Sequence, residues 1–125
     1  MAKLHFLYMR QFDSGPVYDM LNAEEHIAYT GDLTGHTEVV ASFVDKGAGL
    51  ARLARMLDVK KEETAAIGDS DNDVTMLRWA GSSVAMGGAV NHVRAAATYQ
   101  TDDCDHDGFA KAVRMLLAAD KEEQA

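Results

Sequence analysis

The 125-residue sequence contains one cysteine, one proline and no long apolar run. A single cysteine, Cys104, cannot form a disulfide within the chain, which fits a reducing compartment. A transmembrane helix needs about 18 or more consecutive apolar residues, and no such run is present. The N-terminal segment has too short an apolar stretch and no small-residue cleavage site for a signal peptide. We therefore expect a soluble, cytoplasmic protein.

Basic residues are also scarce. The chain has 12 Lys and Arg against 20 Asp and Glu, which gives a formal net charge of −8 and a pI of about 4.9. Phosphate backbones and anionic lipid surfaces repel a chain this acidic, so we expect neither nucleic acid nor a membrane as a partner. The 47% of hydrophobic residues is ordinary for a globular protein, and the length suits one small domain.

Residues 1–44 predict a strand, a helix and a hairpin. Alternating apolar residues near the start favour the strand. Pro16, which follows an Asp-Ser-Gly turn, is typical of the first position of a helix. Two β-like runs, 26–30 and 37–44, are separated by a turn-rich segment, as in a β-hairpin.

Residues 45–125 instead alternate short apolar strands with amphipathic helices. Strands are expected at 64–67 and 83–86. Such alternation is typical of β-α-β crossovers and a parallel sheet, so the predicted fold class is α/β, with a small α+β segment in front. The spacing of apolar residues predicts helices that contain, in order, Leu50, Val74, Val93 and Val113.

An acidic loop follows the strand predicted at 64–67. Asp69, Asp71 and Asp73 place three carboxylates in five residues, and these repel one another unless a cation or hydrogen-bond donors lie among them. Oxygen ligands select Mg²⁺ or Ca²⁺, and ligands of open α/β sheets bind beyond the carboxyl ends of the strands. An EF-hand is excluded because Val74 stands where that loop needs glycine. The alternative interpretation is helix capping, for which Asp and Asn are preferred.

Lys46 is the second candidate, at the start of the helix between the hairpin and the strand at 64–67. An ammonium group in that position neutralises charge on a bound phosphate. The alternative is a solvated surface lysine, which is the commoner fate of a single lysine.

The other polar residues indicate no site. The charged loop 102–107 is expected to be solvated. The histidines show no metal-ligand spacing, and we expect them at the surface or packed on strands; they are His5, His26, His36, His92 and His106.

Three blocks stand in order along the chain: Asp45-Lys46-Gly47-x-Gly49-Leu50, Ala66-Ile67-Gly68-Asp69-Ser70-Asp71-Asn72-Asp73-x-x-Met76-Leu77 and Ala80-Gly81-x-x-Val84-Ala85-Met86-Gly87-x-Ala89. These blocks resemble the haloacid dehalogenase-like (HAD) hydrolases, most closely their Cof-type sugar-phosphate phosphatases. The trailing segment 101–110 resembles the final loop and helix start of that branch. The resemblance implies a HAD-like, Rossmannoid parallel sheet of which this chain covers a part. It assigns 1–44 to a cap-like remnant and 45–125 to the C-terminal half of the core.

The same resemblance implies roles for four residues. Lys46 matches the catalytic lysine that neutralises the phosphate, and Asn72 matches a residue that orients the phosphate or supports the metal site. Asp69 and Asp73 match the acids that hold Mg²⁺. Such enzymes transfer a phosphoryl group to an aspartate and then hydrolyse the aspartyl phosphate with water. The implied function is Mg²⁺-dependent hydrolysis of small phosphorylated metabolites.

The family's nucleophile loop, Asp-x-Asp-Gly-Thr, is not recognisable ahead of Lys46. The segment that starts at Asp32 superficially resembles this nucleophile loop, but only 13 residues separate Asp32 from Lys46. The other aspartate considered, Asp13, lies in an ordinary turn. We therefore expect the isolated chain to be weakly active or inactive. The alternative function is a non-catalytic module, derived from such a phosphatase, that binds metal or phosphate or forms oligomers.

The resemblance also bears on partners. In the resembling fold, the strand at 64–67 pairs with the strand that carries the nucleophile. Without that neighbour, the strand leaves a row of unpaired backbone groups, which favours association. We expect a homo-oligomer or a complex with a chain that supplies the missing half.

Overall fold

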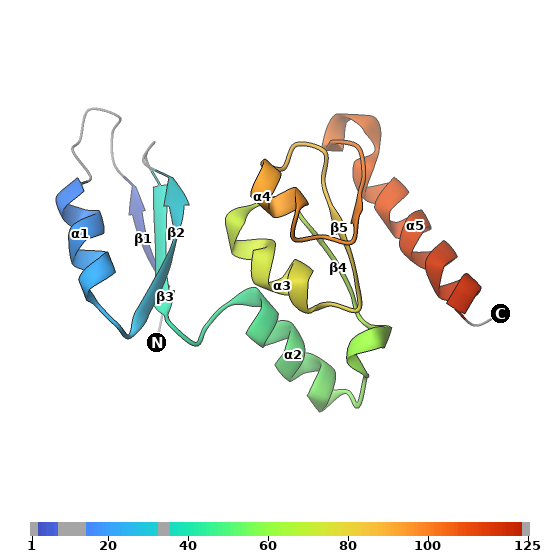
Figure 1. Cartoon of the computed structure of the whole chain (residues 1–125), viewed down its shortest axis with the longest axis horizontal. Helices are drawn as coiled ribbons and strands as arrows, with labels where there is room; N and C mark the ends of the chain where they lie inside the picture. The colour runs from blue at the N-terminus through green and yellow to red at the C-terminus, as the bar shows by residue number, and fades with distance from the viewer. Residues whose placement is uncertain (1–2, 8–14, 33–35, 124–125) are drawn as a thin grey trace. The chain divides into compact units, whose positions relative to one another are not determined.

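The computed structural model describes residues 3–7, 15–32 and 36–123. The chain divides into two compact units, Met1–Asp45 and Lys46–Ala125 (Figure 1). Within the described ranges, no helix is both long enough and apolar enough to cross a membrane.

The first unit contains a three-stranded antiparallel sheet and one helix, as the sequence predicts. Both other strands pair with β3, which is the central strand. This strand ends earlier than the predicted run 37–44, because the N–H of Val44 donates to the carbonyl of Ala41 and turns the chain. The elements are β1 (Leu4–Leu7), α1 (Gly15–Ala23), β2 (Ile27–Asp32) and β3 (His36–Ala41).

The two faces of this sheet differ. Thr37, Val39 and Ala41 of β3 are buried, whereas the residues that alternate with them are exposed or half-buried. The Tyr18 hydroxyl of α1 lies 2.6 Å from the Thr37 hydroxyl, so α1 covers the buried face. His36 and Glu38 therefore stand on the face opposite α1, because side chains alternate along a strand.

The second unit is built on a parallel sheet of order β4-β5-β6. Together with the small antiparallel sheet, it confirms the predicted α/β fold class. Short 3₁₀ turns occur at Lys61–Glu63, Asp71–Asp73 and Cys104–His106. The elements are α2 (Lys46–Met56), β4 (Ala65–Gly68), α3 (Val74–Trp79), β5 (Ser82–Ala85), α4 (Asn91–Arg94), β6 (Tyr99–Gln100) and α5 (Gly108–Glu123).

Two elements differ from the sequence expectation. β6 has only two residues, too few to show any periodicity. The helix expected around Val93 is short and ends at Arg94, because the N–H groups of Ala96 and Ala97 bond to carbonyls only three residues back. Those shorter bonds tighten the last turn and direct the chain into β6.

Helices cover both faces of the parallel sheet. α3 packs on β4 and β5 from one side, and α5 packs on the same strands from the other (Figure 1). Val84 and Ala85 of β5 are completely buried, as expected for the central strand of a covered parallel sheet. The core beneath α3 and α4 contains small residues that let the helices approach the sheet; it comprises Ala66, Leu77, Ala80, Ala89 and Val93.

β4 pairs with β5 along one edge only, and the described residues supply no strand for its other edge. Its carboxyl end at Gly68 lies level with Ala85 of β5. The acidic loop begins at that point, at the end of the sheet where ligands of open α/β folds bind.

Two glycines of α2 test how closely this helix packs against α3. Alanine is expected to lower the free energy of unfolding at one of them and to raise it at the other. A Cβ on Gly47 would lie 2.6 Å from the carbonyl oxygen of Thr75, whereas a Cβ on Gly49 meets nothing within 4 Å. Gly47→Ala should lower the free energy of unfolding by about 1–3 kcal/mol through overpacking. Gly49→Ala should raise it by about 0.5–1 kcal/mol, because alanine is the better helix former. Urea denaturation measures both, and a tolerated Gly47→Ala would contradict the α2–α3 contact.

Candidate active site

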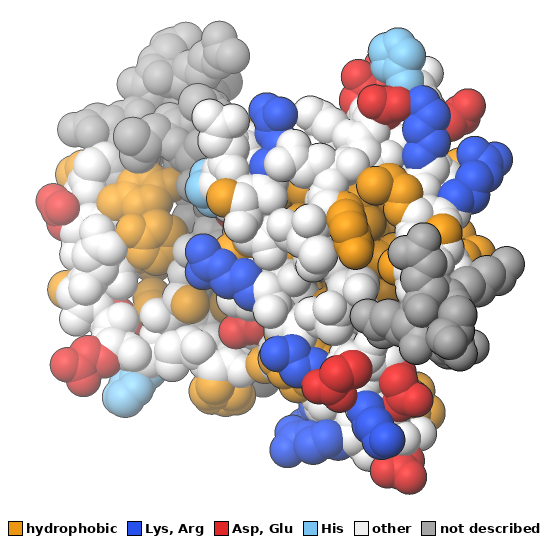
Figure 2. Space-filling view, turned by 45° about the vertical axis from the view of Figure 1, so that its right-hand side comes forward, with side chains coloured by type: hydrophobic (Ala, Val, Ile, Leu, Met, Phe, Trp, Pro, Cys, Tyr) orange, Lys and Arg blue, Asp and Glu red, His pale blue; other side chains and the backbone are white. Residues whose placement is uncertain are grey.

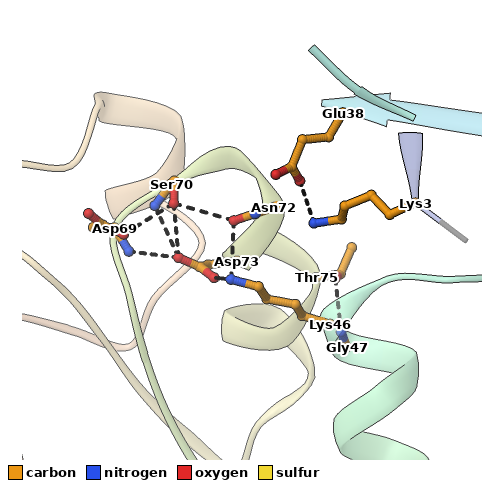
Figure 3. A network of polar contacts seen from close by, with 9 residues as sticks. All are labelled: Lys3, Glu38, Lys46, Gly47, Asp69, Ser70, Asn72, Asp73 and Thr75. Atoms are coloured by element: carbon orange, nitrogen blue, oxygen red, sulfur yellow. Dashed lines mark hydrogen bonds and ion pairs between the residues drawn. The ribbon is translucent and has the colours of Figure 1, made fainter. Parts of the chain in front are cut away.

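The acidic loop is a compact turn between β4 and α3. Ser70 has extended backbone and precedes the 3₁₀ turn Asp71–Asp73, and the N–H of Asp73 donates to the Ser70 carbonyl at 2.9 Å. The turn gathers its polar side chains at the carboxyl end of β4 (Figure 3).

Asp73 is the centre of the loop. Only 6% of its side chain is exposed, although it carries a charge. Its Oδ2 accepts hydrogen bonds from the N–H groups of Asp69, at 3.0 Å, and Ser70, at 3.2 Å. Its Oδ1 is paired with the ammonium of Lys46. Both carboxylate oxygens therefore have charge-assisted partners, which is the condition for burying a charge at acceptable cost.

Gly68 makes room for this carboxylate. A Cβ on Gly68 would lie 2.6 Å from the Cβ of Asp73 and 2.8 Å from its Oδ2. Any side chain here would push Asp73 away from the backbone N–H groups that it accepts. The sequence motif Gly-Asp therefore has a steric basis in this chain.

Lys46 reaches the loop from the first residue of α2. Its Nζ donates to the Asn72 side-chain oxygen at 3.3 Å in addition to the Asp73 carboxylate. The next residue is anchored as well, because the N–H of Gly47 donates to the Thr75 hydroxyl at 3.0 Å (Figure 3). Nearly half of the Lys46 side chain, 48%, remains exposed, so the ammonium is accessible to a ligand.

The surroundings of Asp73 lower its pKa. Burial by itself raises the pKa of Asp73, but the hydrogen bond from Lys46 and those from the backbone of Asp69 and Ser70 outweigh it. The net pKa of Asp73 lies below its ordinary value, so this carboxylate stays ionised at neutral pH.

Asp69 is exposed and has a weaker set of partners. Its Oδ1 lies 3.1 Å from the Ser70 hydroxyl, which also lies 3.3 Å from Asn72 Oδ1 and from Asp73 Oδ2. A hydroxyl has a single proton and can donate it to only one of these three oxygens at a time. Asp69 therefore keeps an exposed carboxylate that a ligand can reach.

The donor atoms of the acidic loop are of the type that Mg²⁺ binds. Asp69, Asn72 and Asp73 present carboxylate and amide oxygens, without nitrogen or sulfur donors, and Mg²⁺ prefers such hard ligands together with water and phosphate oxygens. The exposed Asp69 leaves room for those further ligands.

The structure brings together the four residues that the sequence singled out. Lys46, Asn72 and Asp73 are in direct contact, and Ser70 links Asp69 to them. Ser70 was not singled out from the sequence, although a serine before a helical turn is a typical capping residue.

Two further contacts were also missed. Asp71 pairs with the His92 side chain, and Thr75 anchors Gly47. Asp71 and His92 are 21 residues apart, and no sequence pattern signals that contact.

The structure does not test a catalytic role for the two aspartates weighed as substitute nucleophiles. Asp32 ends β2 and pairs in register with His36. Asp13 and residues 33–35 lie outside the described residues.

The charged loop 102–107 is on the surface, as expected. His106 Nδ1 lies 2.6 Å from Asp103 Oδ1, and this hydrogen bond lowers the pKa of Asp103. Lys111 pairs with Asp102. Figure 2 shows acidic, basic and histidine side chains gathered at the top right of the molecule, where this loop meets α5.

This fold and this site match one family. The haloacid dehalogenase-like hydrolase family matches residues 13–113, and the chain belongs to it. A 5-amino-6-(5-phospho-D-ribitylamino)uracil phosphatase of Bacillus subtilis is 38% identical over 98 residues, which are 78% of this chain and 39% of that protein.

Solved structures agree. A HAD phosphatase of Bacteroides thetaiotaomicron, BT1666, matches with a TM-score of 0.80 and 31% identity over 90% of this chain and 41% of that one. The subclass IIB sugar phosphatase BT4131 matches with a TM-score of 0.74 and 34% identity over 80% and 38%. These matches confirm the resemblance to the Cof-type branch and the HAD-like fold. The chain spans about two fifths of the length of each of these three relatives.

The lowered pKa of Asp73 predicts how stability depends on pH. A carboxyl with a lowered pKa in the folded state stabilises the fold above its unfolded pKa of about 4, and that contribution is lost as pH falls through the folded pKa. Asp73→Asn should therefore lower the free energy of unfolding at pH 7 by about 2 kcal/mol.

The difference in free energy of unfolding between the wild type and Asp73→Asn should shrink as pH drops below about 4, where the wild-type carboxyl is itself protonated. Urea denaturation in EDTA from pH 7 to pH 2.5 measures it. Asp19→Asn, on the exposed surface of α1, is the control and should leave the curve unchanged. A deficit that stays constant with pH would contradict the charged role of Asp73.

Proposed function

We propose that this chain forms the phosphate- and Mg²⁺-binding part of a phosphatase-type hydrolase that acts on small phosphorylated metabolites. One observation carries the proposal: an accessible lysine ammonium, an amide and an exposed carboxylate converge at the carboxyl end of β4 around a buried, ionised aspartate. The family and its phosphatase relatives support the same class of reaction.

In this proposal Lys46 binds the phosphoryl oxygens and neutralises their charge during transfer. Asn72 fixes the direction of the ammonium through its side-chain oxygen and turns its amide N–H₂ toward the phosphate. Asp73 acts through Lys46 and the loop backbone, since both of its oxygens are occupied within the chain.

Asp69 would hold Mg²⁺ directly, and Asp73, the second acid that the family resemblance assigns to the metal, would support the site by fixing Lys46 and the loop backbone. When bound, the ion supplies charge stabilisation for phosphoryl transfer. The exposed position of Asp69 and its single shared hydroxyl partner leave its oxygens free for that role.

The acceptor of the phosphoryl group lies elsewhere in this proposal. No Asp-x-Asp-Gly-Thr loop precedes Lys46 in the sequence. The relatives extend well beyond the part that this chain matches. We propose that a carboxylate from that further part, in the same polypeptide or in another, completes the site next to the open edge of β4.

A second candidate is a module that binds phosphate and metal without turnover. The unrecognised nucleophile loop favours it. Both candidates share the binding site, so binding and turnover need separate measurements.

Binding is tested by calorimetric titration of the chain with Mg²⁺ and with inorganic phosphate. Asp69→Asn should weaken Mg²⁺ binding at least tenfold, and Lys46→Met should weaken phosphate binding by about 10- to 100-fold, the range for a charge-assisted hydrogen bond. Asp19→Asn and Lys61→Met alter exposed groups outside the site and serve as controls. Unchanged affinities in both site variants would mean that the loop only caps α3.

Turnover is tested separately by hydrolysis of p-nitrophenyl phosphate with and without Mg²⁺. We expect little or none from the chain alone. Mg²⁺-dependent turnover that Asp69→Asn abolishes would show that a nucleophile exists within these 125 residues, with Asp13 and Asp32 to be tested first.

The open edge of β4 predicts association. At micromolar concentration, light scattering should show a species larger than the monomer, because an uncovered strand edge pairs with other chains. Ala65→Lys places a charge on this edge strand and should shift the chain toward the monomer; Ala118→Lys, on exposed α5, should not. A stable wild-type monomer would contradict the prediction.

A further inference from the structure

Two histidines and a glutamate stand together in the first unit, away from the acidic loop in sequence. His5 of β1 lies directly opposite Glu38 of β3, and His36 lies two residues from Glu38 on the same strand. Side chains two apart on a strand, and those directly opposite across a pair, share one face of the sheet. All three side chains therefore project from the face opposite α1.

Their ligand atoms form a small triangle. His5 Nδ1 lies 3.3 Å from His36 Nε2 and 3.6 Å from Glu38 Oε1, and the last two atoms are 3.9 Å apart. A tetrahedral Zn²⁺ site with bonds of about 2.0–2.2 Å has donor atoms about 3.3–3.6 Å apart. The circle through the three atoms has a radius of about 2.1 Å, so one ion can bond to all of them with little movement.

The carboxylate is already oriented for such an ion. Lys3 Nζ donates to Glu38 Oε2 at 2.7 Å (Figure 3). The other carboxylate oxygen, Oε1, is the one that lies near the two imidazoles. Hydrogen-bonded support of this kind is usual for the ligands of protein metal sites. Both imidazoles are about half exposed, 48% each, which gives an ion a path of entry.

The donor types select the class of ion. Two imidazole nitrogens and one carboxylate oxygen suit Zn²⁺ and neighbouring first-row transition ions, whereas Mg²⁺ prefers oxygen alone. The site therefore differs in metal preference from the acidic loop.

A bound metal would stabilise the first unit by linking its strands. Of its residues whose side-chain burial the structure describes, only Thr37, Val39 and Ala41 are buried. The unit spans Met1–Asp45, and domains of that size commonly add a metal or a disulfide. A metal bound by His5 and His36 would join β1 to β3 across 31 positions of the sequence.

We propose that His5, His36 and Glu38 form a transition-metal site that binds Zn²⁺ through His5 Nδ1, His36 Nε2 and Glu38 Oε1 and stabilises the sheet of the first unit. Water supplies the remaining ligand. The competing explanation is a hydrogen bond between the two imidazoles beside the Lys3–Glu38 ion pair, with no affinity for metal.

Zn²⁺ titration of the full chain by calorimetry, with Co²⁺ absorption as a second readout, tests the proposal. The wild type should bind one equivalent at this site. His36→Gln and Glu38→Gln should each weaken Zn²⁺ binding at least tenfold and remove the Co²⁺ ligand-field bands, while circular dichroism confirms that they fold. Glu38→Gln keeps the size of the side chain and an acceptor for Lys3.

Two controls locate the effect. His26→Gln removes an exposed histidine outside the cluster, and Asp69→Asn alters the acidic loop; both should keep Zn²⁺ affinity. Zn²⁺ should also raise the melting temperature of the wild type but not of His36→Gln. Equal affinity in the wild type and His36→Gln, loss of binding in Asp69→Asn alone, or no binding at all would overturn the proposal.

Discussion

The ion pair between the buried carboxylate of Asp73 and the half-exposed Lys46 is the interaction on which the second unit's site depends. A carboxylate with 6% of its side chain exposed needs compensation, and it receives it from the ammonium and from two backbone N–H groups. These bonds join the start of α2 to the loop after β4. They also fix the lysine at the end of the sheet where a ligand binds. The same contact therefore stabilises the fold and positions the functional group.

The contacts of the acidic loop also bear on the repulsion among its carboxylates. Three carboxylates in five residues repel one another, yet each has a different partner. Asp73 pairs with Lys46, Asp71 pairs with His92, and Asp69 has only the shared hydroxyl of Ser70. The ammonium of Lys46 compensates the charge of Asp73, and Asp69 has the weakest partner of the three. A divalent cation can therefore approach Asp69 without displacing Lys46.

Much of this could be predicted from the sequence, for identifiable reasons. The acidic loop and Lys46 fall at the ends of elements whose hydrophobic periodicity is strong, so their proximity follows from the α/β pattern and from the family resemblance. β6 could not be found, because two residues show no period. The pair of Asp71 with His92, and the group of His5, His36 and Glu38, depend on tertiary contacts and strand register across 21 to 33 positions of the sequence. The histidines lie on the surface and on strands as expected, and the juxtaposition of His5 and His36 comes from strand register, which spacing along the chain cannot reveal.

The two proposed metal sites differ in ligand chemistry. The acidic loop offers only oxygen donors at the mouth of a parallel sheet, beside a lysine that attracts phosphate. The group on the antiparallel sheet offers two imidazoles and one carboxylate, with a lysine that engages the far carboxylate oxygen. Mg²⁺ competes poorly for imidazole nitrogen. A Zn²⁺ ion at the acidic loop alone would lack the nitrogen ligands that favour it in the first unit. A lysine contacts a carboxylate in each group, so the two groups are alike in carrying a nearby positive charge. The expected difference in ion preference therefore comes from the identity of the donor atoms and not from net charge.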